Sequence, residues 1–272
     1  MATRRVVTWN IRAAIGPGPF PDRWWARIDA ERLRAIGDLL GSTDAEIIAL
    51  QEVALLSRDG ALIDNAGDLA RQLGMEVSFS AVRTFSVMDG DAVTGVGCFG
   101  NALLSRTPIF AARTVALPAA PMDALIEPHG VDHRAAGISY ADAPASVREP
   151  RCLLIAQVDG LTIGSTHFSH NGSGERLLQA VATVAAFDSS SRALLLGDLN
   201  AAIESPELAP FGNWTDALDA PPGDAARVST DDGMRIDQVL ARGVSVSGGK
   251  VLRQSGDLSD HYPLGAEVVA PS

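Results

Sequence analysis

Short apolar runs alternate with longer segments of helical periodicity along most of this chain, which predicts strands alternating with helices. The apolar runs predict strands at Arg4–Ile11, Glu46–Val53, Val77–Phe85, Phe99–Ser105, Ile109–Leu117, Arg151–Val158, Leu161–His167, Ala193–Leu196, Ile236–Leu240 and Leu264–Val269. Helical periodicity predicts helices at Ala30–Leu40, Ala66–Leu73 and Glu175–Phe187. The last helix has an apolar side formed by Leu177, Leu178, Val181, Val184 and Ala185, and we expect this side to pack on a sheet.

The two halves of the chain share one plan. In the first half a predicted strand ends at Asn10, a helix follows, and the next strand ends at Glu52. In the second half the corresponding strands end at His167 and at Asp198 with Asn200. Two such units packed sheet on sheet bring all these strand ends to one rim. The fold class we predict is therefore an α/β (α+β) four-layer sandwich, with two packed mixed β-sheets flanked by helices.

Composition and charge narrow the class of protein. With 46% apolar and 20% charged residues the chain is typical of a globular protein, and we expect a single domain over residues 1–272. The net charge of -11 disfavours tight non-specific binding of nucleic acid, although local binding through metal ions stays compatible with it. We see no signal peptide and no membrane segment and expect a cytoplasmic protein, while the oligomeric state is not indicated. Cys98 and Cys152 favour two buried thiols over one disulfide.

Two long segments lack periodicity. Ala119–Glu149 is rich in Pro, Ala and Asp, and Pro221–Met234 is polar and acidic. We expect them to be loops that shape a substrate site at the rim, with plain surface loops as the alternative.

Carboxylates follow two of the buried runs. Glu52 comes directly after Ile47–Leu50 and could bind a hard cation such as Mg²⁺, or it could be a strand-end carboxylate in solvent. Asp198 and Asn200 are spaced to point the same way along an extended segment, where they could orient a water and a phosphoryl oxygen. The alternative for this pair is an ordinary turn.

Three further polar positions are candidates for acid–base chemistry. A carboxylate such as Asp237 can fix the tautomer of a histidine such as His261 and stabilise its cation. The adjacent Asp260 could meanwhile reach a metal ion, whereas a helix cap or surface pair would explain Asp260 and His261 without function. His167 ends a largely apolar strand and could donate to a phosphoryl oxygen or be a satisfied core histidine.

Taken in order along the chain, these motifs resemble the endonuclease/exonuclease/phosphatase superfamily, which has the deoxyribonuclease-I-like fold. The segments that carry the resemblance are Thr8-Trp9-Asn10-Ile11, Leu50-Gln51-Glu52-Val53, Asn101-Ala102-Leu103-Leu104-Ser105-Arg106, Ser165-Thr166-His167, Gly197-Asp198-Leu199-Asn200, Arg235-Ile236-Asp237 and Ser259-Asp260-His261. Each motif is weak alone, but their order spans nearly the whole chain.

The resemblance implies a Mg²⁺-dependent hydrolase of a phosphoester substrate, with Mn²⁺ as the alternative cofactor. Glu52 would bind the metal, with Asn10 and Asp260 close to it. The ion would polarise the phosphoryl group and help the leaving oxygen depart.

The remaining roles implied by the resemblance belong to the second half. Asp198 would position or deprotonate the attacking water, and Asn200 would fix the phosphate or that aspartate. His261, held by Asp237, would act as a base or stabilise developing charge, and His167 would donate to the phosphate.

Departures from the family pattern bear on the substrate. Ser229–Met234 is acidic and has no aromatic residue, where members often have one, and Ala119–Glu149 contains only Arg134 and Arg148 as permanent cations. We therefore favour a phosphatase or phosphodiesterase acting on a small or lipid-derived phosphoester over an endo- or exonuclease on DNA or RNA. A catalytically silent binding protein on the same fold is the alternative of another class.

Overall fold

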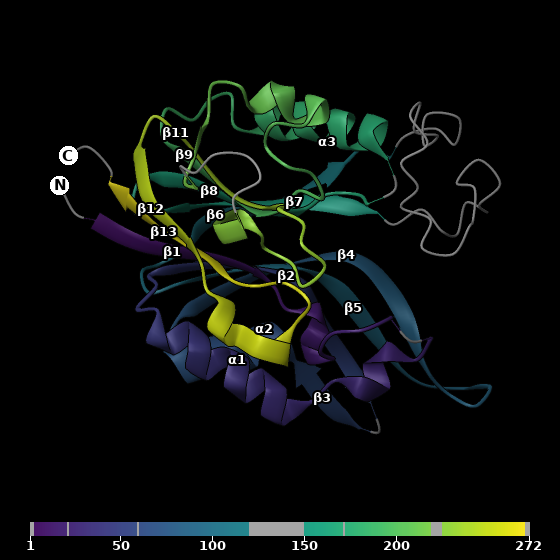
Figure 1. Cartoon of the computed structure of the whole chain (residues 1–272). Helices are drawn as coiled ribbons and strands as arrows, with labels where there is room; N and C mark the ends of the chain where they lie inside the picture. The colour runs from purple at the N-terminus through teal and green to yellow at the C-terminus, as the bar shows by residue number, and fades with distance from the viewer. Residues whose placement is uncertain are drawn as a thin grey trace.

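In the computed structural model, which describes residues 3–20, 22–58, 60–119, 150–170, 172–218 and 225–269, two mixed β-sheets pack face to face (Figure 1). The strand order in the larger sheet is β12 (Ser245–Val251), β13 (Leu264–Val269), β1 (Thr3–Asn10), β2 (Ile47–Arg58), β5 (Ala92–Ser105) and β4 (Glu76–Asp89), with β3 (Ala61–Asp64) paired to β2. The order in the smaller sheet is β10 (Thr215–Asp216), β11 (Asp237–Arg242), β9 (Ala193–Asp198), β8 (Leu161–His167), β7 (Arg151–Val158) and β6 (Phe110–Leu117).

The core between the sheets is aliphatic. It includes Val6, Ile47 and Leu103 from the larger sheet and Leu154, Ile163 and Leu196 from the smaller one, all buried. The central strands, such as β8 and β9, are buried on both sides because helices cover the outer faces, which explains their nearly continuous apolar runs.

Helices form the two outer layers. Helices α1 (Ala30–Ser42) and α2 (Asn65–Leu73) cover the larger sheet, and α3 (Ser173–Ala186) covers the smaller sheet (Figure 1). Asp29 caps α1 by accepting the Glu31 and Arg32 N–H groups at 2.8 and 3.1 Å. Such a cap satisfies amide groups that have no partner inside the helix. The predicted four-layer sandwich is confirmed.

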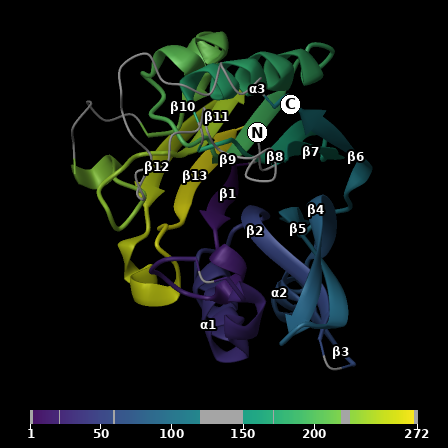
Figure 2. The same cartoon turned by 90° about the vertical axis from the view of Figure 1, so that its right-hand side faces the viewer.

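Parallel pairing at the centre of each sheet brings the chemical motifs together. Strands β1 and β2 are parallel with Asn10 opposite Gln51, and β8 and β9 are parallel with His167 opposite Asp198. The two pairs meet at one rim, on opposite sides of the interface between the sheets (Figure 2). The predicted convergence is therefore observed, except that β2 does not end there but continues to Arg58.

The prediction that the apolar side of α3 packs on the sheet is wrong for most of its residues. Its members Leu177, Leu178 and Val181 are 40%, 43% and 52% exposed. The buried side is mainly polar and consists of Glu175, Arg176, Gln179, Ala180 and Thr183, although Val184, a member of the predicted side, packs partly against the core. The helix exists where the pattern predicts it, but the periodicity of its apolar residues indicated the opposite face.

Hydrogen bonds explain the orientation of α3. Gln179 accepts the Ser169 backbone N–H at 2.8 Å, and Glu175 accepts the Ser169 hydroxyl at 3.1 Å. Arg176 forms a buried ion pair with Glu207 at 2.9 Å. The helix thus binds the segment that follows β8, and hydrogen-bonded buried polar groups add to the apolar packing of Ala180 and Val184 at this layer.

Element boundaries differ from prediction mainly in the larger sheet. β4 and β5 form a long hairpin that extends beyond the predicted Val77–Phe85 and Phe99–Ser105. Strands β3, β10 and β12 were not predicted, because they are short or, in β12, contain Gly248-Gly249 in place of an apolar run.

The two segments for which the sequence predicted loops lie partly outside the described residues. Ala119–Glu149 lies outside the described residues except for its first residue, and so does the start of Pro221–Met234. Cys98 and Cys152 are both free thiols, but Cys98 is only half-buried, unlike Cys152. In the parts of the chain that are described, no helix combines the length and apolar character that a membrane crossing requires.

Candidate active site

Glu52 reaches the rim through an irregularity in β2. The pairing of β2 with β5 shifts register between Leu50 and Val53, and Glu52 has a positive φ of 53°. A bulge of this kind re-aims one side chain out of the regular alternation, and left-handed backbone at a non-glycine residue is a strain typical of functional sites. The predicted strand end at Glu52 is wrong, because β2 continues through the bulge to Arg58; neither this continuation nor the bulge could be predicted from the apolar run.

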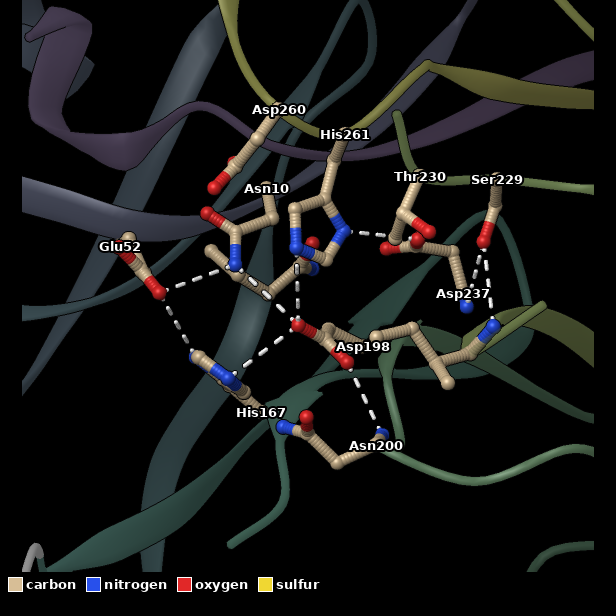
Figure 3. Close-up of polar contacts among 12 residues, drawn as sticks. Asn10, Glu52, His167, Asp198, Asn200, Ser229, Thr230, Asp237, Asp260 and His261 are labelled. Carbon is tan, nitrogen blue, oxygen red and sulfur yellow. Dashed lines mark hydrogen bonds and ion pairs between the residues drawn. The ribbon is translucent and has the colours of Figure 1, made fainter. Parts of the chain in front are cut away.

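The strand ends of the two sheets are in direct contact (Figure 3). The Asn10 side-chain amide donates to Glu52 Oε1 at 3.1 Å and to Asp198 Oδ2 at 3.2 Å, so one residue of β1 joins the two sheets. His167 Nε2 lies 3.2 Å from Asp198 Oδ2, and His167 Nδ1 lies 3.9 Å from Glu52 Oε1. These four residues come from four different strands, three from strand ends and Glu52 from the bulge inside β2, and they form one polar cluster.

Glu52 and Asp260 are the two carboxylates on the side of the cluster formed around β1 and β2. We call this the first-half side, although Asp260 itself comes from near the C-terminus. Glu52 Oε2 is buried and has no hydrogen-bond partner among the described residues. Burial raises the pKa of Glu52, and the neighbouring Asp260 carboxylate raises it further. Burial likewise raises the pKa of Asp260. A buried carboxylate oxygen without a partner is costly, and a bound cation would remove that cost.

Arg12 also contacts this side, although sequence analysis did not identify it. Its Nε lies 3.2 Å from Asp260 Oδ2, and its backbone N–H donates to Asn10 Oδ1 at 3.1 Å. Arg12 has a positive φ of 45°, which turns the chain sharply after β1. Its place two residues after Asn10 is the signal that could have identified it.

His261 and Asp237 form a buried pair on the second-half side. His261 Nδ1 lies 2.9 Å from Asp237 Oδ2, and His261 Nε2 lies 3.7 Å from Asp198 Oδ2. The backbone around Asp237 is held by Ser229, whose hydroxyl accepts the Asp237 N–H at 3.2 Å. The Trp9 indole donates to the His261 carbonyl at 2.8 Å, which fixes the same segment against β1. Ser229, in the described part of Pro221–Met234, therefore positions the backbone that carries Asp237.

Burial and neighbouring charges shift the pKa values of Asp198, His261 and His167 in different directions. Burial raises the pKa of Asp198, the His261 charge lowers it and the Asp237 charge raises it, and the net result is a pKa of about 7. Burial lowers the pKa of His261, but the Asp237 and Asp198 carboxylates outweigh this and raise it to about 10. Burial, followed by the positive charge of Arg151, lowers the pKa of His167 well below 6.5. At neutral pH His261 is therefore a cation and His167 is neutral.

Asn200 differs from the prediction of an extended segment. Its φ of 49° is left-handed, and its side-chain amide donates to the Phe168 carbonyl at 2.9 Å. Its backbone N–H donates to Asp198 Oδ1 at 2.9 Å. The turn expected as the alternative is what the chain forms. Asn200 nevertheless lies beside Asp198, which it orients through its main chain.

Two groups of residues could hold a metal ion. Asp198, Asp237 and His261 each offer a ligand atom, and these atoms lie within 4.8 Å of one another. In this group the His261 cation already pairs with the carboxylates, through Asp237 Oδ2, while Asp237 Oδ1, like Glu52 Oε2, is buried with no hydrogen-bond partner among the described residues. Glu52, Asn10 and Asp260 form the other group, and the buried oxygen of Glu52 without a partner fits a cation there.

A cleft of about 300 Å³ opens onto the cluster. Glu52, His167, Asp198, Asn200 and His261 line one part of it. The rest is lined by Phe20, Arg83, Phe99, Arg151 and His170, which sequence analysis did not propose as site residues. They come from segments far apart in the chain and share no motif, so no sequence signal marked them.

Comparison with known proteins identifies the family. A sequence model described as the Endonuclease/Exonuclease/phosphatase family matches residues 7–261. Members of this family generally hydrolyse phosphoester bonds. No curated protein sequence matches the chain.

Solved structures share the fold over nearly the whole chain. An endonuclease/exonuclease/phosphatase from Beutenbergia cavernae is 19% identical with a TM-score of 0.70, covering 99% of this chain and 72% of its own. The human Nocturnin catalytic domain with bound sulfate is 17% identical with a TM-score of 0.65, covering 98% of this chain and 93% of its own. A mannosyl-6-phosphatase from Bacteroides thetaiotaomicron is 17% identical with a TM-score of 0.63, covering 98% of this chain and 99% of its own.

Proposed function

Because the chain belongs to the endonuclease/exonuclease/phosphatase family, we propose that it is a divalent-metal-dependent phosphoester hydrolase acting on a small or lipid-derived phosphoester. The observation that carries the proposal is the meeting of two different groups in one cleft. Glu52 has a buried carboxylate oxygen with no hydrogen-bond partner, which a cation would satisfy, and in the same cleft Asp198 has a pKa of about 7. These are the two requirements for metal-assisted attack of water on phosphorus.

The proposed metal ligands are on the first-half side. Glu52 would hold the ion, with Asn10 and Asp260 beside it, and oxygen donors suit Mg²⁺ or Mn²⁺. When bound there, the ion would polarise the phosphoryl oxygen and neutralise charge on the leaving oxygen. Arg12 would hold the Asp260 carboxylate toward this position, 3.2 Å from its guanidinium.

The proposed acid–base groups are on the second-half side. Asp198, with a pKa of about 7, would position the attacking water and accept its proton. The Asn200 main chain and the Asn10 amide would hold the two oxygens of Asp198 in place.

The two histidines would serve different purposes. His261 is cationic at neutral pH because of Asp237, so we assign it to stabilising negative charge that develops on the phosphoryl group rather than to the base. Neutral His167, in the same cleft, would donate an N–H to a phosphoryl oxygen.

The size and charge of the site favour a small substrate. A cleft of about 300 Å³ is at the small end of ligand pockets, and the chain carries a net charge of -11. Both features disfavour a nucleic-acid duplex, whose binding depends on neutralising many phosphates. The mannosyl-6-phosphatase among the structural neighbours supports a phosphomonoester as a substrate worth testing.

The test is a panel of phosphomonoesters, phosphodiesters, DNA and RNA assayed with Mg²⁺, with Mn²⁺ and with chelator. We expect hydrolysis of at least one small ester that EDTA abolishes and added metal restores. Cleavage of nucleic acid in preference to every small ester would favour the nuclease alternative. No hydrolysis of any ester with either metal would contradict the proposed function.

A further inference from the structure

Aromatic side chains form one group beside the cleft, and Phe20 is its most exposed member. The centre of the Trp24 ring lies 5.0 Å from that of the Phe85 ring and 5.2 Å from that of the Phe99 ring. Trp24 and Phe99 are buried, whereas Phe20 is 40% exposed. Phe20 and Phe99 both line the cleft of the candidate active site. The wall of the cleft therefore offers apolar surface at Phe20 that the described part of the chain leaves open to a ligand.

Three contacts hold the Phe20 ring in place. It lies edge to face with the Trp24 ring at 5.6 Å and with the Phe99 ring at 6.3 Å, measured between ring centres. The guanidinium carbon of Arg12 lies 5.0 Å from the centre of the Phe20 ring, a cation–π contact. A side chain that is already held by its neighbours loses little conformational entropy when a ligand packs on it. The exposed surface of Phe20 is thus pre-positioned for binding.

Phe20 lies on the first-half side of the cleft. Arg12, which contacts its ring, also lies 3.2 Å from Asp260. In the proposed function the cation on this side neutralises the leaving oxygen, and Asp198 activates the attacking water on the other side. The attacking and leaving oxygens are roughly in line in phosphoryl transfer, so the leaving group points away from Asp198. The alcohol that leaves would therefore lie beside Phe20.

We infer that the leaving group of the substrate is an apolar alcohol, whose carbon skeleton packs on the exposed ring of Phe20 beside Phe99. This inference rests on the proposed function, because it places the scissile ester between Glu52 and Asp198. An apolar skeleton gains free energy by leaving water at this wall, whereas a hydroxylated one must also give up the water bound to its hydroxyl groups. Phe20 is then a residue that determines specificity.

Matched substrates test the inference in the protein with Mg²⁺. Cyclohexylmethyl phosphate and glucose 6-phosphate both carry a six-membered ring on a CH₂–O–phosphate group, and both release a primary alkoxide. A difference between them therefore reports on the ring and not on the leaving oxygen. We expect the wild type to prefer cyclohexylmethyl phosphate by about tenfold to a hundredfold in kcat/KM, mainly through KM, as burial of one apolar ring provides. Methyl diesters of the same two alcohols replace the monoesters if the enzyme hydrolyses only diesters.

Variants locate the preference. Phe20→Ala should lower kcat/KM for cyclohexylmethyl phosphate at least about fivefold more than for glucose 6-phosphate, because it removes the apolar surface. Phe20→Leu keeps apolar surface but loses the contact with the Arg12 cation, and it should retain most of the preference. Phe110→Ala is the matched control, since it removes an exposed phenylalanine of β6 that does not line this cleft, and it should leave the preference unchanged. Melting temperatures confirm that each variant is folded.

The results separate the inference from the function beneath it. Equal kcat/KM for the two esters in the wild type, or a preference that survives Phe20→Ala, would overturn the inference while phosphoester hydrolysis stands. Equal losses on both esters in Phe20→Ala and in Phe20→Leu would mean that Phe20 acts through Arg12, and this result would overturn it as well. Absence of hydrolysis of every ester in the broader panel would overturn the proposed function itself.

Discussion

The two halves of this molecule use the same strand–helix–strand plan and fasten their helices in opposite ways. In the first half α1 buries Leu33, Ile36 and Leu40 against the larger sheet. In the second half α3 exposes its leucines and buries Glu175, Arg176 and Gln179. Helix α1 is held mainly by burial of apolar surface, which is a non-directional interaction. Helix α3 is held in addition by hydrogen bonds to the segment after His167, and these require a defined geometry. The architecture is thus shared, but the buried polar side of α3 is what fastens the second helix to the segment beside the site.

The strand ends of the two halves also have different parts in the proposed chemistry. The first half supplies Asn10 and Glu52, which suit a cation. The second half supplies His167 and Asp198, which suit proton transfer. The following substitutions and conditions test this difference between the two halves.

The largest expected effect comes from the acid–base groups. Asp198→Ala or His261→Ala should lower kcat/KM at least about a hundredfold, because each removes a group that acts on the transition state. The deficit should persist at saturating Mg²⁺, which steady-state assays over a metal titration would check. Near-wild-type turnover by either folded variant would refute the assigned role.

The next largest effect is expected from the buried ion pair that anchors α3. Arg176→Met should destabilise the protein by about 3–5 kcal/mol, because Glu207 is left buried without its partner. It should also lower the activity of the protein that remains folded, since α3 holds Ser169 beside the site.

Ile36→Ala in α1 is the matched control for this helix. It should cost about 2–5 kcal/mol through a cavity in the core and leave kcat of the folded protein unchanged. Urea unfolding, with assays below the transition, measures both variants. Equal effects of the two on kcat would show that α3 is not coupled to the site.

Sequence anticipated the strand ends better than the surfaces around them. A carboxylate placed directly after a buried run, as Glu52 and Asp198 are, has few structural uses, so these positions were predictable. The face of α3 was not, because Leu177 and Val181 have the spacing of a packed helix whether or not anything covers them. Arg83 and Arg151 were not predictable either, since only the pairing of distant strands brings them to one cleft.

An effect spread over several pH units is expected in the metal-free protein. The pKa of His261 is raised from 6.5 to about 10, so its protonation stabilises the fold fully below pH 6.5 and this contribution is lost as the pH rises toward 10. The free energy of unfolding should fall over that interval by at most about 1.4 kcal/mol per pH unit from this proton.

The variant His261→Gln isolates that contribution. Urea unfolding with EDTA at several pH values should give a flatter profile for this variant than for the wild type between pH 7 and 10. Parallel profiles would mean that His261 is not charged in the folded protein. The Asp198 pKa of about 7 affects a separate interval, below pH 7.

The smallest effect is expected on the solvent side of α3. Val181→Gln should change the free energy of unfolding by no more than about 0.5 kcal/mol, because this side chain is 52% exposed. A loss of several kcal/mol, measured in the same urea titration, would indicate that the apolar side of α3 is covered in the folded protein.

The most direct test of the division between the two halves is Mn²⁺ binding, followed by the electron paramagnetic resonance signal of the free ion. Glu52→Gln and Asp237→Asn each replace one buried carboxylate by an amide, on the first-half and second-half sides respectively. The account predicts that Glu52→Gln weakens Mn²⁺ binding at least about tenfold, while Asp237→Asn binds within about threefold of wild type. Loss of affinity in Asp237→Asn with none in Glu52→Gln would place the ion at the histidine pair and contradict the account.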